Sequence, residues 1–288
     1  MTMKSLDATL AALADSEATR HRCGNAAPPG THKRTGSLSP IILTDAAVTL
    51  TGPDRELAAL LPILSTALHS EQGRASLIER LGEKFGAEKA SQAKFILTGH
   101  HKFGSGIYLV GGDACVTAEG DGIVFATEHA QVVAHGHFDV YACDHADIKG
   151  FDDAQIFAVE NVTISAASGH VRGFASGNVQ GDVLDGSAWT LSGNARFDVR
   201  GAVTVEASDD VMLRMYNSSR LSAKGNVKAI MYERAMAWLK GNAKAELWGD
   251  TIAYADRLEH VKVLGGEARK VQRTGAKTSF AIRAWRSR

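Results

Sequence analysis

A histidine-rich cluster holds the side chains that are best suited to chemistry. Its members lie in one short stretch of the chain: His129, His135, His137, Asp139 and His145. Neutral imidazoles and carboxylates are ligands that Zn²⁺ prefers, and a zinc ion with an open position activates water for hydrolysis. One alternative is therefore a metal-dependent enzyme with zinc as its cofactor. The other is a protein without a cofactor, because His, Asp and Asn also favour the conformations found at chain bends.

The composition limits the classes of protein to which the chain can belong. Of its 288 residues, 44% are apolar and 22% are charged, which excludes a wholly disordered chain and a bundle of membrane-spanning helices. The 32 basic residues balance 32 acidic ones, so neither a DNA mimic nor a strongly basic DNA-binding protein is expected. Three cysteines are too few for a disulfide framework.

An eight-residue repeat must position these side chains, and it runs from about residue 108 to residue 263. Representative units are VFATEHAQ from Val124, WTLSGNAR from Trp189 and LSAKGNVK from Leu221. Positions 7, 1 and 3 of the unit are small or apolar, and alternate positions point to one side of a strand. Positions 5 and 6 are rich in bend-forming Gly, Asn and Asp. This alternation predicts a parallel β-solenoid, with one extra residue absorbed between Ile164 and Trp189.

The length of one coil follows from the aromatic residues. Tyr216, Tyr232 and Trp248 recur at position 4 with a spacing of 16. This spacing favours coils of about 16 residues, with 24 residues as the alternative. Coils stacked at about 4.8 Å would bring His129 and His145 together at one bend. The expected fold class is mainly β, a parallel β-solenoid with a small N-terminal helical cap.

Two adjacent acid pairs offer a further chemistry. Asp152 and Asp153 form one pair, and Asp209 and Asp210 form the other. Paired carboxylates act as acid and base in glycoside-cleaving enzymes or bind Ca²⁺. Both pairs fall at positions 5 and 6 of the repeat, where the chain bends, and adjacent strand residues point to opposite sides. Turn formation therefore explains them, and we assign no catalytic residue.

Four segments are expected along the chain. Residues 1–40 lack apolar periodicity, which predicts a flexible N-terminal segment. Residues 41–99 carry apolar stripes at helical spacing and are expected to form a small helical cap domain. Residues 100–266 form the β-solenoid, and residues 267–288 form a basic tail.

Targeting signals are not evident in the sequence. Asp7 and Asp15 flank the apolar part of the first residues, unlike the uninterrupted apolar core of a Sec signal. No stretch reaches the roughly 18 apolar residues that cross a bilayer. The protein is expected to be cytoplasmic, or exported without a Sec signal.

The last 21 residues are strongly basic, with seven bases and no acid. Basic residues interleaved with aromatic ones contact phosphates, so nucleic acid or anionic lipid is a candidate partner of this tail. A solvated tail is the simpler interpretation. The bases are Arg269, Lys270, Arg273, Lys277, Arg283, Arg286 and Arg288.

The pattern VxAxGxAx is plainest between Ala237 and Asp256. In this style of repeat the chain resembles the octapeptide-repeat solenoid segments of bacterial and phage proteins, over roughly residues 108–263. The resemblance implies a parallel β-solenoid and a bacterial or phage origin. It implies no catalytic residues.

Outward aromatic residues predict a surface for a protein partner. Tyr216, Tyr232, Trp238 and Trp248 lie at positions that do not face the narrow core, and exposed aromatics commonly mark interfaces. The leading hypothesis is therefore a non-enzymatic interaction or structural module on a rigid solenoid. An exported effector body without a Sec leader is a further alternative. No second helical cap is evident at the C-terminal solenoid end, so either the tail folds back over it or a second subunit covers it as a homodimer.

Overall fold

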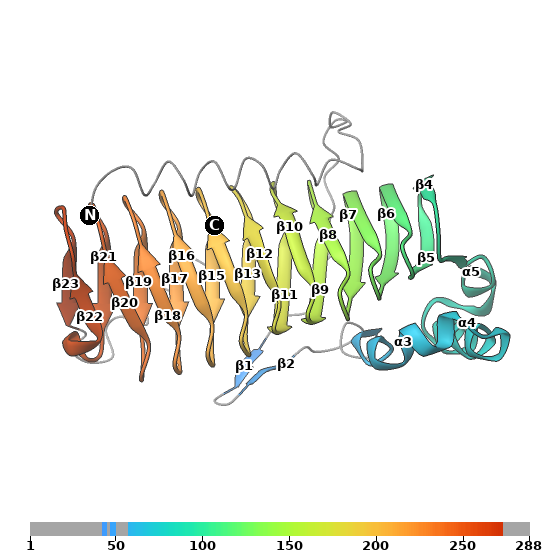
Figure 1. Cartoon of the computed structure of the whole chain (residues 1–288), viewed down its shortest axis with the longest axis horizontal. Coiled ribbons are helices and arrows are strands. Elements are labelled where there is room, and N and C mark those ends of the chain that lie inside the picture. The colour runs from blue at the N-terminus through green and yellow to red at the C-terminus, as the bar shows by residue number, and fades with distance from the viewer. Residues whose placement is uncertain (1–41, 45–46, 50–56, 273–288) are drawn as a thin grey trace. The chain divides into compact units, whose positions relative to one another are not determined.

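The structure is a computed structural model that describes residues 42–44, 47–49 and 57–272. Its main body is a parallel β-solenoid whose coils stack along one axis (Figure 1). Each coil contributes one strand to each of two facing sheets, which we call sheet 1 and sheet 2. The strands of successive coils pair in parallel because each bend returns the chain to the same side one coil later.

Sheet 1 contains β3 (Lys94–Ile96), β5 (Gly106–Val110), β9 (Gln155–Glu160), β11 (Arg172–Gly177), β13 (Ala188–Leu191), β15 (Thr204–Ala207), β17 (Arg220–Ala223), β19 (Met236–Leu239), β21 (Ile252–Ala255) and β23 (Arg269–Gln272). Sheet 2 contains β4 (His100–Phe103), β8 (Asp147–Gly150), β10 (Thr163–Ala167), β12 (Gln180–Val183), β14 (Arg196–Val199), β16 (Met212–Met215), β18 (Lys228–Met231), β20 (Lys244–Leu247) and β22 (Val261–Val263). Two longer strands, β6 (Cys115–Ala126) and β7 (Gln131–Ala142), bend from sheet 2 into sheet 1. A 3-10 turn, η1 (Leu258–His260), precedes β22.

The register confirms the coil length that the sequence predicts. Val205 pairs with Leu221, and Leu221 pairs with Ala237, so neighbouring strands differ by 16 residues. The extra residue that the repeat must absorb lies in β10, where the pairing with β8 shifts between Ile164 and Ala166. The alternative of 24 residues per coil is wrong, because it would need three strands in each coil.

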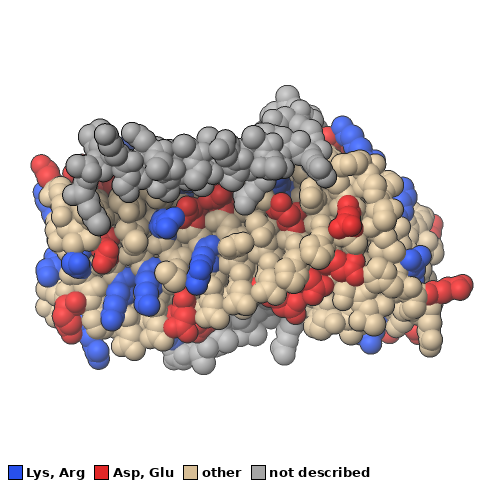
Figure 2. Space-filling view, viewed as in Figure 1, with Lys and Arg blue, Asp and Glu red and all other residues tan. Residues whose placement is uncertain are grey.

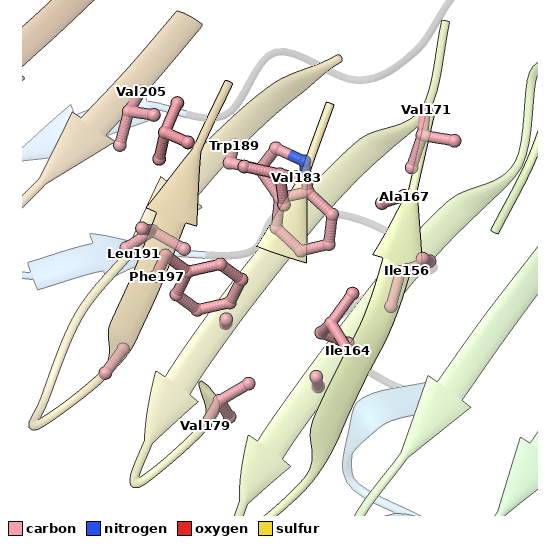
Figure 3. Packing of buried hydrophobic residues seen from close by; sticks show 14 of the residues in the cluster. Ile156, Ile164, Ala167, Val171, Val179, Val183, Trp189, Leu191, Phe197 and Val205 are labelled. Atoms are coloured by element: carbon pink, nitrogen blue, oxygen red, sulfur yellow. The ribbon is translucent and has the colours of Figure 1, made fainter. Parts of the chain in front are cut away.

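The interior is a narrow core of inward Ala, Val and Leu side chains. Larger rings fit only where a neighbouring coil leaves space. Trp189 of β13 is in register with Gly173 of β11, and a Cβ atom at Gly173 would overlap the indole. The indole also packs on Phe197, with 5.5 Å between ring centroids (Figure 3). The small residue and the large one are therefore a matched pair across two coils.

Three helices precede the first coil: α3 (Leu61–Leu68), α4 (Glu71–Phe85) and α5 (Ala87–Ser91). The α4 helix begins at Ser70, whose side chain accepts a hydrogen bond from the Gly73 amide at 3.0 Å, and it ends at Gly86, which has a left-handed φ of 87°. A short antiparallel hairpin, β1 (Ile42–Thr44) and β2 (Ala47–Thr49), lies earlier in the chain.

The helices cover the outer face of sheet 1 over the early coils (Figure 1). Leu77 and Leu81 of the predicted apolar stripe are fully buried there. They share one hydrophobic cluster with a row of outward side chains on sheet 1: Leu109, Phe125, Tyr141, Phe157 and Phe174. The cap therefore protects the flank of the solenoid, because the early coils present an apolar row that would otherwise meet water.

Candidate functional site

The histidine cluster is divided between two bends on opposite sides of the solenoid. His129 and His145 lie where sheet 1 turns into sheet 2, and their rings stack with 5.6 Å between centroids. This stacking is the arrangement that the 16-residue coil predicts. His135 and His137 lie within β7, where the chain turns from sheet 2 into sheet 1. Half a coil therefore separates the two pairs.

Carboxylates face the histidines of the second bend. The Nδ1 atom of His135 is 3.8 Å from Oδ2 of Asp152, and Nδ1 of His137 is 3.6 Å from Oδ2 of Asp153. His170, one coil further on, places its Nδ1 3.5 Å from the other oxygen of Asp153. The sequence did not single out His170, because the extra residue in β10 shifts it to a spacing of 17 from Asp153.

The five candidate zinc ligands of the alternative hypothesis do not meet at one place. Asp139 lies in the part of β7 that belongs to sheet 1, beyond His137. Among residues 57–272 and the two short strands before them, no group of three or more His, Cys, Asp or Glu side chains has a metal-binding arrangement. The geometry thus provides pairs of imidazole and carboxylate groups from neighbouring coils on one bend, at separations of 3.5–3.8 Å that are longer than hydrogen bonds.

Acidic residues at the bends have a structural role. Asp144, Asp152 and Asp209 have left-handed φ values between 56° and 61°. The carboxylates of Asp152 and Asp209 accept hydrogen bonds from backbone amides of the preceding coil, namely Gly136 at 3.1 Å and Gly193 at 3.2 Å. These bonds satisfy amide groups that the bend leaves without a strand partner. The structure thus supports turn formation for both predicted acid pairs.

An asparagine ladder continues the first bend through the later coils. Asn178 donates to the Asn161 side chain at 3.1 Å, and Asn194 donates to Asn178 at 3.3 Å. The same contact recurs from Asn242 to Asn226 at 3.4 Å. Side chains at position 6 of the repeat therefore link neighbouring coils. In the later coils they do so by amide hydrogen bonds, and in the early coils by the stacking of His129 on His145.

Cys143 is buried between the solenoid and the helices. Its thiol contacts the Leu61 carbonyl at 3.5 Å and the Thr127 hydroxyl at 3.4 Å. Burial raises the pKa of Cys143 to about 12; Asp144 and Glu160 add to this rise, and the hydrogen bond to Thr127 offsets part of it. The thiolate is the reactive form of cysteine. This thiol is therefore unsuited to act as a nucleophile near neutral pH.

Alkylation of Cys143 at pH 8 is expected to be at least about 100-fold slower in the folded protein than in urea, because the thiolate fraction falls with the raised pKa. Peptide mapping by mass spectrometry would follow this residue alone. The raised pKa also favours the neutral thiol in the fold, so its contribution to stability is complete below about pH 9 and is lost as the pH rises towards 12. Equal alkylation rates in the two states would contradict the burial.

The predicted partner-binding aromatics lie on two different surfaces. Tyr216 and Tyr232 follow β16 and β18 at the second bend, and their rings stack with 4.9 Å between centroids. Trp248 follows β20 in the same row and is 41% exposed. Burial, with the charge of Asp198, raises the pKa of Tyr216 above its ordinary value. Trp238 instead lies on the outer face of sheet 1.

Trp238 belongs to the row of outward side chains on sheet 1. The helices cover the part of this row that lies on the early coils. The row changes character twice along the solenoid. It is apolar under the helices, polar at Thr190, Glu206 and Ser222, and apolar again at Trp238, Tyr254 and Val271. Trp238 and Tyr254 stack with 5.7 Å between centroids. Neither residue is part of a hydrophobic cluster formed by described residues.

The basic tail is only partly described. Arg269 and Lys270 lie in β23 and are exposed. The other predicted residues lie outside the described part of the chain: Arg273, Lys277, Arg283, Arg286 and Arg288. None of the described helices has both the length and the apolar character needed to cross a membrane.

No protein family, curated protein or solved structure matches this chain. The resemblance to octapeptide-repeat solenoids and the expected cellular location therefore stay predictions.

Proposed function

We propose that the protein is a non-enzymatic interaction module, in which a rigid β-solenoid presents aromatic side chains of its later coils to a protein partner. The observation that carries this proposal is the outer row of sheet 1. Its early apolar residues are covered by the protein's own helices, and its late apolar residues, Trp238, Tyr254 and Val271, are packed against no described element. Val271 is 40% exposed.

The polar interval in this row supports the proposal. At Glu206 and Ser222 the same outward position carries side chains that favour water, so the repeat itself does not require an apolar residue there. Large aromatic residues reappear only in the last coils. Because burying aromatic rings stabilises a complex strongly, a partner on these coils would gain affinity from them.

Replacing Trp238 and Tyr254 by serine, or Tyr216, Tyr232 and Trp248 by serine, is expected to abolish co-purification of protein partners from the native host. Anchors of this kind typically contribute about 2 kcal/mol or more each, so two changes weaken binding by more than about 100-fold. Affinity purification with quantitative mass spectrometry would compare each variant with the wild type. Both sets of residues point outward, so the fold is expected to remain intact.

Phe151→Ser is the matched control. Phe151 is an outward aromatic of the early coils that stacks on His135 at 4.8 Å between centroids. This variant is expected to retain the partners. If the late-coil variants kept every partner of the wild type, the proposal would be wrong.

A further inference from the structure

A set of exposed cations covers the outer side of the late strands of sheet 2 and the bend that leads into them. We call this surface the basic face. Five acidic residues share this surface. Asp198 lies 3.8 Å from Arg214 and Glu246 lies 4.0 Å from Lys262, whereas Asp209, Asp210 and Asp256 are exposed on the bend. The basic face comprises Arg196, Arg214, Lys224, Lys228, Lys240, Lys244 and Lys262.

A repeated motif builds the centre of the basic face. The sequence KGNVK runs from Lys224 to Lys228, and KGNAK runs from Lys240 to Lys244 one coil later. Lys228 pairs in register with Lys244, so their side chains leave the sheet side by side. The Asn242 amide donates to Asn226 and holds the two bends together. Lys224 and Lys240 form one pair on neighbouring coils, and Lys228 and Lys244 form another. Within each pair the backbone positions are about 4.8 Å apart.

The fold does not require this concentration of charge. Like charges on neighbouring strands destabilise a sheet, and the same rows of the early coils carry mixed side chains, such as Gln131, Asp147 and Lys149. About five coils separate Asp147 from Lys228, or roughly 24 Å, which exceeds the screening length of about 8 Å in physiological salt. The acidic early coils therefore leave the potential of the basic face largely intact. Lys and Arg gather over the later coils also on the face shown in Figure 2.

The shape of the basic face selects the kind of anion. From β14 to β22 the strands pair without a register shift, which gives a flat surface. Met212, 44% exposed, adds an apolar side chain in the row between Arg196 and Lys228. A flat basic face can contact a flat anionic surface over its whole area. A nucleic-acid duplex is a cylinder and would contact the face along one line only. Single strands need free aromatic faces for stacking, and the outward side chains of β14, β16, β18, β20 and β22 include no aromatic ring.

We propose that the basic face binds the anionic headgroups of a phospholipid surface. Each basic side chain near such a surface strengthens binding by about fivefold. Binding without a deep apolar anchor is expected to be reversible and to weaken steeply with salt. This attachment uses sheet 2 and its preceding bend, so Trp238 and Tyr254 on the outer face of sheet 1 would remain available to a protein partner.

Co-sedimentation of the full-length protein with lipid vesicles tests the proposal. The wild type is expected to bind vesicles of phosphatidylcholine with phosphatidylserine, and to bind neither vesicles of phosphatidylcholine alone nor the anionic vesicles at about 0.5 M salt. Replacing Lys228, Lys240 and Lys244 by glutamine should weaken binding by about 100-fold. These residues point outward and glutamine retains the aliphatic stem, so the melting temperature should not change.

The matched control replaces Arg80, Lys84 and Lys89 of the helices by glutamine, which removes the same charge from another surface. This control should bind as the wild type does. Three outcomes would overturn the proposal: no binding to the anionic vesicles, equal binding by the Lys228, Lys240 and Lys244 variant, or binding to duplex DNA but not to vesicles. Equal binding by that variant would place the attachment elsewhere, such as the C-terminal basic residues.

Discussion

Gly173→Val is expected to lower the free energy of unfolding by at least about 2 kcal/mol. Gly173 lies at an inner position of β11, directly beside Trp189 of β13. A side chain at this position would overlap the indole, which is buried and packed on Phe197. Overpacking of such a core forces strained rotamers or a shift of the backbone. Urea unfolding followed by circular dichroism would measure the change.

Gly104→Val is the matched control, because no atom lies within 4 Å of a Cβ at this exposed position. Its effect should stay within about 0.5 kcal/mol. Trp189→Ala removes the ring and should cost about 3–5 kcal/mol alone. Combined with Gly173→Val it should cost less than the sum of the two, because the added methyl groups fill the vacated space. An unfolding midpoint of Gly173→Val equal to that of the wild type would contradict this packing.

Lys94→Val together with Lys270→Val is expected to produce end-to-end assemblies of the protein. The terminal strands of sheet 1 are β3 and β23. Register places Lys94 beside Tyr108 and Lys270 beside Ala253, and these two neighbours point into the core. Stacking the last coil of one copy on the first coil of another would bring both ammonium groups into a shared interior. An unpaired buried charge costs several kcal/mol, and inward charges are a known protection of sheet edges.

Size-exclusion chromatography with light scattering, over a range of protein concentrations, would detect the assemblies, and electron microscopy would show their shape. The control, Lys102→Val with Lys262→Val, removes equal charge from outward positions of the terminal strands β4 and β22. It should keep the wild-type mass. The inward charge of Lys270 also opposes a homodimer through the C-terminal end, which is one of the two arrangements that the sequence leaves open. A double variant at Lys94 and Lys270 with the wild-type mass at every concentration would refute this role of the charges.

The repeat made most of the fold predictable, because each position of the eight-residue unit has one fixed direction in a solenoid. Spacing alone places Tyr216 beside Tyr232 and His129 beside His145. The same spacing sends His137, eight residues from His129, to the opposite bend, which is why the histidine cluster does not form one site.

The packing of the helices on the solenoid and the contacts near the irregular coil were not predictable from the period of the repeat. The period identifies an outward position but does not say what covers it, so the packing of the helices on Phe125 and Tyr141 became visible only in the structure. Two residues of interest were missed. A single extra residue in β10 displaces His170 from the spacing of 16. Tyr254 stacks on Trp238 on sheet 1, whereas the aromatic spacing used to predict the coil length follows the row of Tyr216 at the opposite bend.

The claim that the late coils form the interaction surface is tested most directly by hydroxyl-radical footprinting of the protein with and without its co-purified partner. Trp238, Tyr254 and Trp248 are expected to lose reactivity in the complex, whereas Phe151 and His129 should keep theirs. Unchanged reactivity of the three late-coil aromatics, with protection at the histidine bends instead, would contradict the account.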